Sequence, residues 1–156
     1  MDIRAAIFPA DASLVRSLFR EYADGLGIDL SFQHFEEELA DLPGKYVAPS
    51  GGLWIATVDD DVAGCVALRP LFAGTCEMKR LYLRPAFRGR GAGRMLVSHV
   101  LSTAAAMGYR RICLDTLPSM KSAIELYRSL GFVAVERYTN NPVPGAMWFA
   151  KELEGS

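Results

Sequence analysis

The stretch that decides the fold is residues 76–93, which read Cys-Glu-Met-Lys-Arg-Leu-Tyr-Leu-Arg-Pro-Ala-Phe-Arg-Gly-Arg-Gly-Ala-Gly. The apolar run at 81–83 is typical of a buried β-strand, which we expect Pro85 to end. The glycine-rich loop that follows is expected to lead into a helix that begins near Gly93. Because the first N–H groups of a helix lack partners and lie at the positive end of its dipole, this loop predicts an anion-binding site.

The charge of the loop and the spacing of its glycines indicate which class of anion it binds. Guanidinium groups match phosphate oxygens, and the loop and the helix start hold Arg88, Arg90 and Arg94. The stretch therefore predicts a ligand with a pyrophosphate or several phosphates. No Walker sequence Gly-x-x-x-x-Gly-Lys-Ser/Thr occurs, and the loop glycines are separated by single residues, unlike the fingerprint Gly-x-Gly-x-x-Gly. A nucleotide enzyme of either kind is therefore not expected.

Hydrophobic periodicity predicts the elements around this stretch. Besides the strand at 81–83, strands are expected over residues 3–8, 53–58, 62–68, 111–115, 132–137 and 146–152, and helices over 12–26, 32–42, 95–107 and 120–130. Asp11 and Ser31 are expected to cap the first two helices, and residues 70–74 to form a turn. This order indicates a mixed α/β sheet with helices on both faces, in a single domain over residues 1–156.

The quoted stretch resembles the central motif of the GNAT family, the Gcn5-related N-acetyltransferases, whose acetyl-CoA loop reads Arg/Gln-x-x-Gly-x-Gly/Ala. Arg88, Gly91 and Gly93 fit that motif. The family follows the loop with a long helix, a buried strand and a second helix ending in Leu-Tyr-x-x-x-Gly-Phe, and residues 126–132 read Leu-Tyr-Arg-Ser-Leu-Gly-Phe. The resemblance is good from about Leu53 onward and holds in outline before it. It implies the GNAT fold, with the order β-α-α-β-β-β-α-β-α-β-β.

The resemblance also implies a reaction, the direct transfer of an acetyl group from acetyl-CoA to a primary amine. The loop amides are expected to hold the pyrophosphate of acetyl-CoA, and the backbone of the preceding strand to pair with its pantetheine arm. The loop residues of this prediction are Arg88, Gly89, Arg90, Gly91, Ala92, Gly93 and Arg94, and the strand residues are Leu81, Tyr82 and Leu83. Members often have an asparagine that contacts the CoA arm where this chain has Met120. That polar contact is therefore in doubt, and the alternative is a contact from Ser119 or Ser122.

Two residues are candidates for proton transfer. Glu77 lies near the place where family members with a carboxylate base carry it, and alternation predicts that it shares a strand face with Lys79, Leu81 and Leu83. The alternatives are an ion pair of Glu77 with a basic group on its own or a neighbouring strand, and a water relay as the base. Tyr127 matches the tyrosine that the family places near the CoA sulfur as general acid. Its alternative is an aromatic core residue of an amphipathic helix.

The acceptor site is expected to be lined by the two N-terminal helices, by their junction and by the loop at 138–142. The residues that the resemblance places there are Tyr22, Phe32, Tyr138 and Asn140. Residues 1–61 hold twelve acidic and four basic side chains, so this half could attract a cationic acceptor. The alternative is that these acidic side chains are ordinary solvent-exposed surface charges. A small amine or amino-acid-like metabolite is the expected acceptor. A protein or peptide amine, and an inactive acyl-CoA-binding sensor, are the alternatives.

Composition limits the remaining possibilities. With 51% hydrophobic residues and a net charge of −1, the chain can bury a full-sized core and is not expected to bind nucleic acid. No apolar run reaches about eighteen residues and no signal-peptide pattern occurs, so a cytoplasmic protein that does not enter the membrane is expected. The three cysteines are expected to be buried free thiols, and two distant histidines indicate no metal site. The resemblance allows a homodimer.

Overall fold

The computed structural model describes residues 1–31 and 34–153, and its elements follow the order expected from the sequence. The strands are β1 (Asp2–Ala5), β2 (Gly52–Val58), β3 (Asp61–Phe72), β4 (Thr75–Leu83), β5 (Arg111–Thr116), β6 (Val133–Val135) and β7 (Met147–Glu152). The helices are α1 (Ala12–Leu26), α2 (Phe35–Ala40), α3 (Ala92–Ala106) and α4 (Lys121–Ser129), with a short 3-10 turn over Pro85–Phe87. The predicted mixed α/β fold is thereby confirmed.

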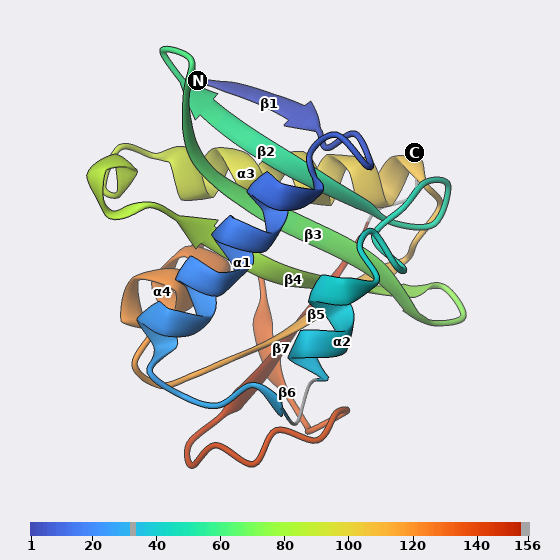
Figure 1. The fold of residues 1–156 in the computed structure, drawn as a ribbon. Coiled ribbons are helices and arrows are strands. Elements are labelled where there is room, and N and C mark those ends of the chain that lie inside the picture. The colour runs from blue at the N-terminus through green and yellow to red at the C-terminus, as the bar shows by residue number, and fades with distance from the viewer. Residues whose placement is uncertain (32–33, 154–156) are drawn as a thin grey trace.

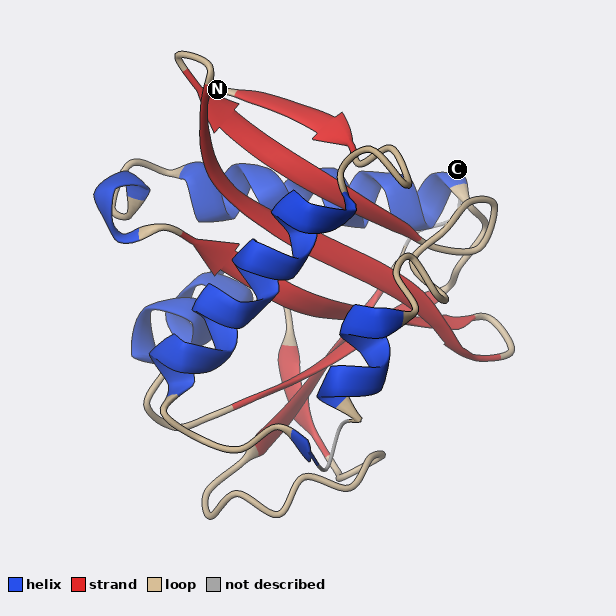
Figure 2. Cartoon of the chain, in the orientation of Figure 1, coloured by secondary structure: helices blue, strands red, loops and turns tan. Residues whose placement is uncertain are grey.

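The strands form one seven-stranded sheet in the order β1-β2-β3-β4-β5-β7-β6. Figure 2 shows the strands in red and the helices that cover them in blue. Neighbours run antiparallel except for β4 and β5, which are parallel. Helices α1 and α2 lie over one face of the sheet and α3 lies behind it (Figure 1). Each face has its own apolar core: Leu18 and Phe19 pack with Ile55 on the first, and Leu96 and Val100 pack with Val66 on the second. Within the described residues, no helix combines the length and apolar character needed to cross a bilayer.

Strand β4 contains a β-bulge at its centre. Arg80 has a φ of 59°, in the left-handed region that residues other than glycine rarely adopt. Lys79 lies opposite Ala67 of β3 while Tyr82 lies opposite Cys65, so β4 has two residues where β3 has one. Such an insertion shifts the alternation of side chains by one residue.

The bulge corrects one expectation from strand alternation. Met78 faces the core under α3 before the bulge, and Leu81 and Leu83 pack against that same core after it. Glu77, one residue before Met78, therefore does not share a face with Leu81 and Leu83. Regular alternation predicted the opposite because a bulge at a non-glycine residue leaves no mark in the hydrophobic pattern.

Strands β4 and β5 are paired over a short distance. Pairing joins residues 75–77 of β4 to residues 111–113 of β5. Beyond Glu77 the two strands part, so the edge of β4 that faces β5 is left out of the recorded pairing from Met78 onward. The sheet therefore has an opening directly beside its central strand.

The predicted turn at residues 70–74 is wrong. Strand β3 continues to Phe72, with Pro70 opposite Cys76, and Ala73 and Gly74 alone separate β3 from β4. Proline has no N–H to give to a ladder, and it is tolerated here because the pairing of β3 with β4 is irregular between Pro70 and Phe72.

The predicted cap of the second helix is also wrong. Helix α2 begins at Phe35 with His34 as its N-cap residue, while the backbone N–H and the hydroxyl of Ser31 both donate to Asp29. The predicted start of that helix at Phe32 lies outside the described residues.

Helix α1 has the predicted bounds, but the Asp11 side chain does not cap it. The carboxylate of Asp11 accepts hydrogen bonds from the two terminal nitrogens of Arg4, at 2.7 and 3.0 Å, and from the N–H of Ile7 at 2.7 Å. The bonds from Arg4, and then the bond from Ile7, hold the pKa of Asp11 at about 2, below its usual value of 3.8. Asp11 thus joins strand β1 to the start of α1.

We expect Asp11→Asn to lower the free energy of unfolding by about 1 kcal/mol at pH 7, after allowance for the exposure of Arg4 to solvent. Because folding lowers the pKa of this carboxyl, its contribution is present above the unfolded value of 3.8 and is lost as the pH falls toward 2. Urea unfolding should therefore separate the variant from the parent at neutral pH and bring them together near pH 2. Asp24→Asn, on the exposed side of α1, is the matched control, and equal losses in both would contradict the pairing.

Candidate active site

The glycine-rich loop meets the N-terminus of α3 at the left edge of the molecule in Figure 1. Gly91 is the N-cap residue of α3 with a φ of 80°, and Gly89 has a φ of 78°. Both backbones lie in the left-handed region, where a side chain is strained, although a Cβ at either position would meet nothing within 4 Å. The first turn of α3 carries no acidic side chain. The loop and helix start therefore keep the features of an anion site.

The arginines of this region have different surroundings. Arg88 donates from Nε to the carbonyl oxygen of Leu83 at 2.9 Å, and its guanidinium lies 5.8 Å from the centre of the Tyr82 ring. Arg94 donates to the hydroxyl of Ser129 at 2.7 Å and so links α3 to α4. Two of the three arginines thus brace the loop against β4 and α4.

A cleft that is partly open to solvent lies where β4 and β5 part. Its walls come from β4 before and after the bulge, from the carboxyl end of β5, and from α1 and α4. Besides Leu81, the lining includes charged, phenolic and amide side chains, namely those of Tyr22, Lys79, Arg80, Asp115, Tyr127 and Asn141. The cleft thus brings together three predicted site residues, Tyr22, Leu81 and Tyr127, that are far apart in the sequence.

Tyr127 is 4% exposed and packs against Phe132, with ring centres 5.7 Å apart. Tyr127 lines the cleft, and its hydroxyl makes no hydrogen bond to another described residue. Burial, reinforced by Tyr22 and Asp115, raises the pKa of Tyr127 well above its usual value of 10. The phenol therefore keeps its proton throughout the neutral pH range.

Glu77 is completely buried and is held on both carboxylate oxygens. Arg69 of β3 contacts Oε1 through Nε at 2.8 Å and through a terminal nitrogen at 2.7 Å. The hydroxyl of Tyr138 donates to Oε2 at 2.9 Å. The geometry therefore matches the alternative for Glu77, an ion pair with a basic group on a neighbouring strand. Neither Glu77 nor Tyr138 lines the cleft.

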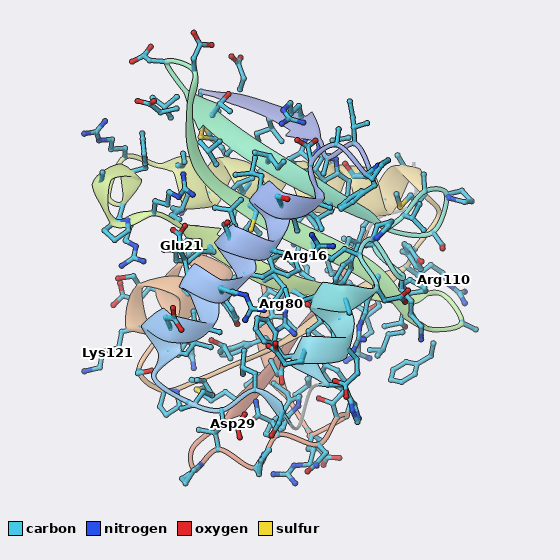
Figure 3. The ribbon with its side chains drawn as sticks, viewed as in Figure 1. Arg16, Glu21, Asp29, Arg80, Arg110 and Lys121 are labelled. Atoms are coloured by element: carbon cyan, nitrogen blue, oxygen red, sulfur yellow. The ribbon has the colours of Figure 1, made fainter. Side chains whose placement is uncertain are left out.

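The bulge residue Arg80 is held by α2. Its Nε donates to Glu38 Oε2 at 2.9 Å and a terminal nitrogen donates to Oε1 at 3.2 Å, while the hydroxyl of Tyr46 donates to Oε1 at 2.8 Å. The guanidinium also lies over the rings of Tyr22 and Phe35, and Figure 3 shows Arg80 between α1 and α2. Charge-assisted bidentate bonds of this kind hold both partners in one geometry. They stabilise the left-handed backbone at the centre of β4.

Sequence reasoning missed Asp115, at the carboxyl end of β5. One of its oxygens accepts a hydrogen bond from Asn141 Nδ2 at 3.1 Å, and the side-chain oxygen of Asn141 accepts one from the N–H of Val143. The carboxylate is close enough to influence the pKa values of Tyr22 and Tyr127. A polar residue at the carboxyl end of a strand next to a parallel neighbour is the signal that could have found it.

The remaining predicted acceptor residues are separated. Asn140 lines a second, adjoining pocket that shares Lys79, Arg80 and Asp115 with the cleft, whereas Tyr138 is bonded to Glu77 outside it. Phe32 lies outside the described residues. Of the two tyrosines placed here by the resemblance, the structure brings Tyr22 into the cleft. In the part of the chain that the structure describes, no three potential ligands are grouped so as to hold a metal.

Comparison with known proteins gives the family. A model of the acetyltransferase (GNAT) family matches residues 14–132. An uncharacterized N-acetyltransferase of Schizosaccharomyces pombe is 38% identical over 155 residues, which cover 98% of this chain and 95% of the relative. The uncharacterized N-acetyltransferase YjgM of Escherichia coli is 31% identical over 131 residues, 82% of this chain and 77% of the relative. Human N-acetylaspartate synthetase is 33% identical over 110 residues, 69% of this chain and 36% of that protein.

Solved structures agree on the fold. A GNAT family acetyltransferase from Staphylococcus aureus has a TM-score of 0.82 at 17% identity, with 98% of this chain and 99% of that chain covered. Another, from Elizabethkingia anophelis and solved with acetyl-CoA bound, has a TM-score of 0.67 at 21% identity, with 97% of each chain covered. The family model, the related N-acetyltransferases and the shared fold together show that this chain belongs to the GNAT family of acetyl-CoA-dependent N-acetyltransferases.

Proposed function

We propose that this enzyme transfers the acetyl group of acetyl-CoA to the primary amine of a small molecule bound in the cleft between β4 and β5. The observation that carries the proposal is the cleft itself, which joins the edge of the loop-bearing strand at Leu81 to the phenol of Tyr127. In the reaction, the amine nitrogen bonds to the thioester carbon, the carbon–sulfur bond breaks, the nitrogen loses a proton and the sulfur gains one.

Acetyl-CoA would bind along β4 and the loop. The backbone N–H groups of residues 88–94 would hold the pyrophosphate, helped by the dipole of α3. The pantetheine arm would pair with the edge of β4 at Leu81, Tyr82 and Leu83, which β5 leaves free.

We expect Gly91→Ala to raise the Kd for CoA about tenfold, because alanine in the left-handed region costs on the order of 1–2 kcal/mol and the loop relaxes away from its bound shape. Isothermal titration with CoA measures the change, and the melting temperature should hardly move. Gly25→Ala is the matched control, since Gly25 lies in helix α1 with open space around a Cβ. It should leave the Kd unchanged, and an unchanged Kd in Gly91→Ala as well would remove the loop from the CoA site.

Two groups would move the protons. Tyr127 would donate to the departing sulfur, since its raised pKa keeps the hydroxyl protonated. For the base, the sequence predicted Glu77, but that carboxylate is buried and held by Arg69 and Tyr138. Asp115 is a carboxylate that lines both the cleft and the adjoining pocket. We therefore assign acceptance of the amine proton, directly or through water, to Asp115 and a positioning role to Glu77.

A small acceptor is favoured over a protein or peptide amine. The cleft lies between secondary structure elements and not along an exposed groove, and its lining is polar at the carboxyl end of β5. Relatives named N-acetylaspartate synthetase point toward an amino-acid-like acceptor. We further propose that the chain is a single domain that works in the cytoplasm, a reducing compartment that suits three buried free cysteines.

The test is release of the free CoA thiol from acetyl-CoA in the presence of amines, amino acids and basic peptides. Acceptor-dependent release with small amines supports the proposal, and release with peptides alone would favour the protein-acceptor alternative. If CoA binds but no compound of either kind gives release, the proposed transfer to a small amine fails.

A further inference from the structure

Lys79 is a cation that lines the cleft and has no partner among the described residues. It lies directly before the bulge of β4 and lines both the cleft and the adjoining pocket. Within the described residues, no carboxylate lies within 4.0 Å of its ammonium group, and it makes no hydrogen bond. Burial lowers the pKa of Lys79 from its usual value of 10.5, because the charged form has lost much of its water. An ammonium group so placed gains most from an anion that enters the cleft.

The arginines around Lys79 are already engaged. Arg80 is held by Glu38 through two hydrogen bonds, and Arg69 is held by Glu77. These two guanidinium groups stabilise the protein itself and do not need a ligand. Lys79 therefore differs from both, although all three line the adjoining pocket.

The open charges of the cleft form a complementary pair. Asp115 lines the same two pockets as Lys79, but the two are not within ion-pair distance of each other. Arg80 is already paired with Glu38. The other charged groups that line the cleft are the ammonium group of Lys79, from β4, and the carboxylate of Asp115, from β5. A molecule that carries an ammonium group and a carboxylate matches both charges at once.

We propose that Lys79 binds a carboxylate of the acceptor, so that the substrate of this enzyme is an amine that also carries a carboxylate, such as an amino acid. This inference rests on the proposed transfer to a small amine and names its substrate class. The ammonium end of the acceptor would lie toward Asp115 and Tyr127, where the acetyl group arrives. An acceptor with amines alone would leave Lys79 buried opposite a second cation.

The test begins with the parent enzyme and needs no variant. All twenty amino acids are compared by thiol release, and the best acceptor is then compared with its carboxamides, each carboxylate being amidated in turn. We expect amidation of one carboxylate to raise KM by about tenfold to a hundredfold, the usual effect of losing a charge-assisted hydrogen bond. Binding of the same compounds to the enzyme–CoA complex, measured by isothermal titration, should show a matching loss of affinity without any turnover.

Variants then assign the effect to Lys79. Lys79→Met keeps the apolar stem and removes the charge, and it should raise KM for the acid to the value for the amide while changing kcat by less than about threefold. Lys79→Arg should restore part of the preference for the acid. Lys45→Met, which removes an exposed lysine outside the cleft, should behave as the parent.

Each outcome has one meaning. Turnover of simple amines or amides as well as of acids, with Lys79→Met equally impaired on both, overturns the inference and leaves the proposed function in place. Acid-selective binding to the CoA complex without turnover supports the inference and contradicts the proposed function. No binding and no turnover of any amino acid overturns the inference.

Discussion

We expect replacement of Tyr127, the proposed general acid, by phenylalanine to lower kcat by about a hundredfold and to change KM for acetyl-CoA by less than about threefold. The phenol lines the cleft and keeps its proton at neutral pH, because burial raises its pKa. Without it, the CoA thiolate must take a proton from water. Steady-state kinetics with acetyl-CoA and the best acceptor measure the change.

Stability should not explain this loss. The Tyr127 hydroxyl has no partner among the described residues, so removing it costs little, and the ring keeps its contact with Phe132. We expect the melting temperature of Tyr127→Phe to stay within about 2 °C of the parent. Tyr109→Phe is the matched control, since it removes a hydroxyl that donates to the carbonyl oxygen of Ser50 outside the cleft. A kcat in Tyr127→Phe equal to that of the control would show that water protonates the sulfur.

Local signals in the sequence predicted the helical framework well. Leu18, Phe19 and Tyr22 recur at helical spacing and Gly27 follows, so α1 begins and ends at the predicted residues, with Gly27 in the left-handed conformation. The two loop glycines at 89 and 91 have the positive φ that their role at a helix start requires. Where a single residue type, such as glycine at a helix end, determines the backbone conformation, the sequence is sufficient to predict the local structure.

The bulge at Arg80 shows what the sequence could not predict. An arginine with a left-handed backbone conformation is unfavourable on its own. At Arg80 this conformation is stabilised by Glu38, which is 42 residues away in the chain. No local pattern records that contact. The face on which Glu77 lies, and with it the choice of base, depends on this single shift of alternation.

The same limit applies to charge. The acidic N-terminal half suggested attraction of a cationic acceptor, yet two of its carboxylates are bonded to arginines in β4 or directly after it. Glu21 accepts hydrogen bonds from Arg84 and Glu38 accepts them from Arg80. Part of the charge asymmetry along the sequence therefore serves to join α1 and α2 to the central strand. The structure, and not the sequence, shows that Lys79 has no such partner among the described residues.

Glu77 and Asp115 should respond in opposite ways when each carboxylate is replaced by its neutral amide. Glu77→Gln leaves the guanidinium of Arg69 without its counter-charge in a mostly buried site. Loss of one partner of a buried pair costs about 3–5 kcal/mol, and because Arg69 is 31% exposed we expect about 2 kcal/mol, measured by urea unfolding. Its kcat should fall by less than about tenfold, since Glu77 does not line the cleft.

Asp115→Asn should show the reverse. Among the described residues, the Asp115 carboxylate has one hydrogen-bond partner, Asn141. An asparagine oxygen can accept the same hydrogen bond, so stability should change by less than about 1 kcal/mol. The amide cannot take a proton from the amine, so kcat should fall by about a hundredfold near neutral pH. If instead Glu77→Gln keeps its stability and loses kcat while Asp115→Asn stays active, Glu77 is the base that the sequence predicted, and water must reach it past Arg69 and Tyr138. The two variants thus decide between the base predicted from strand alternation, Glu77, and the base proposed from the geometry of the cleft, Asp115. Each account assigns the larger loss of kcat to its own carboxylate.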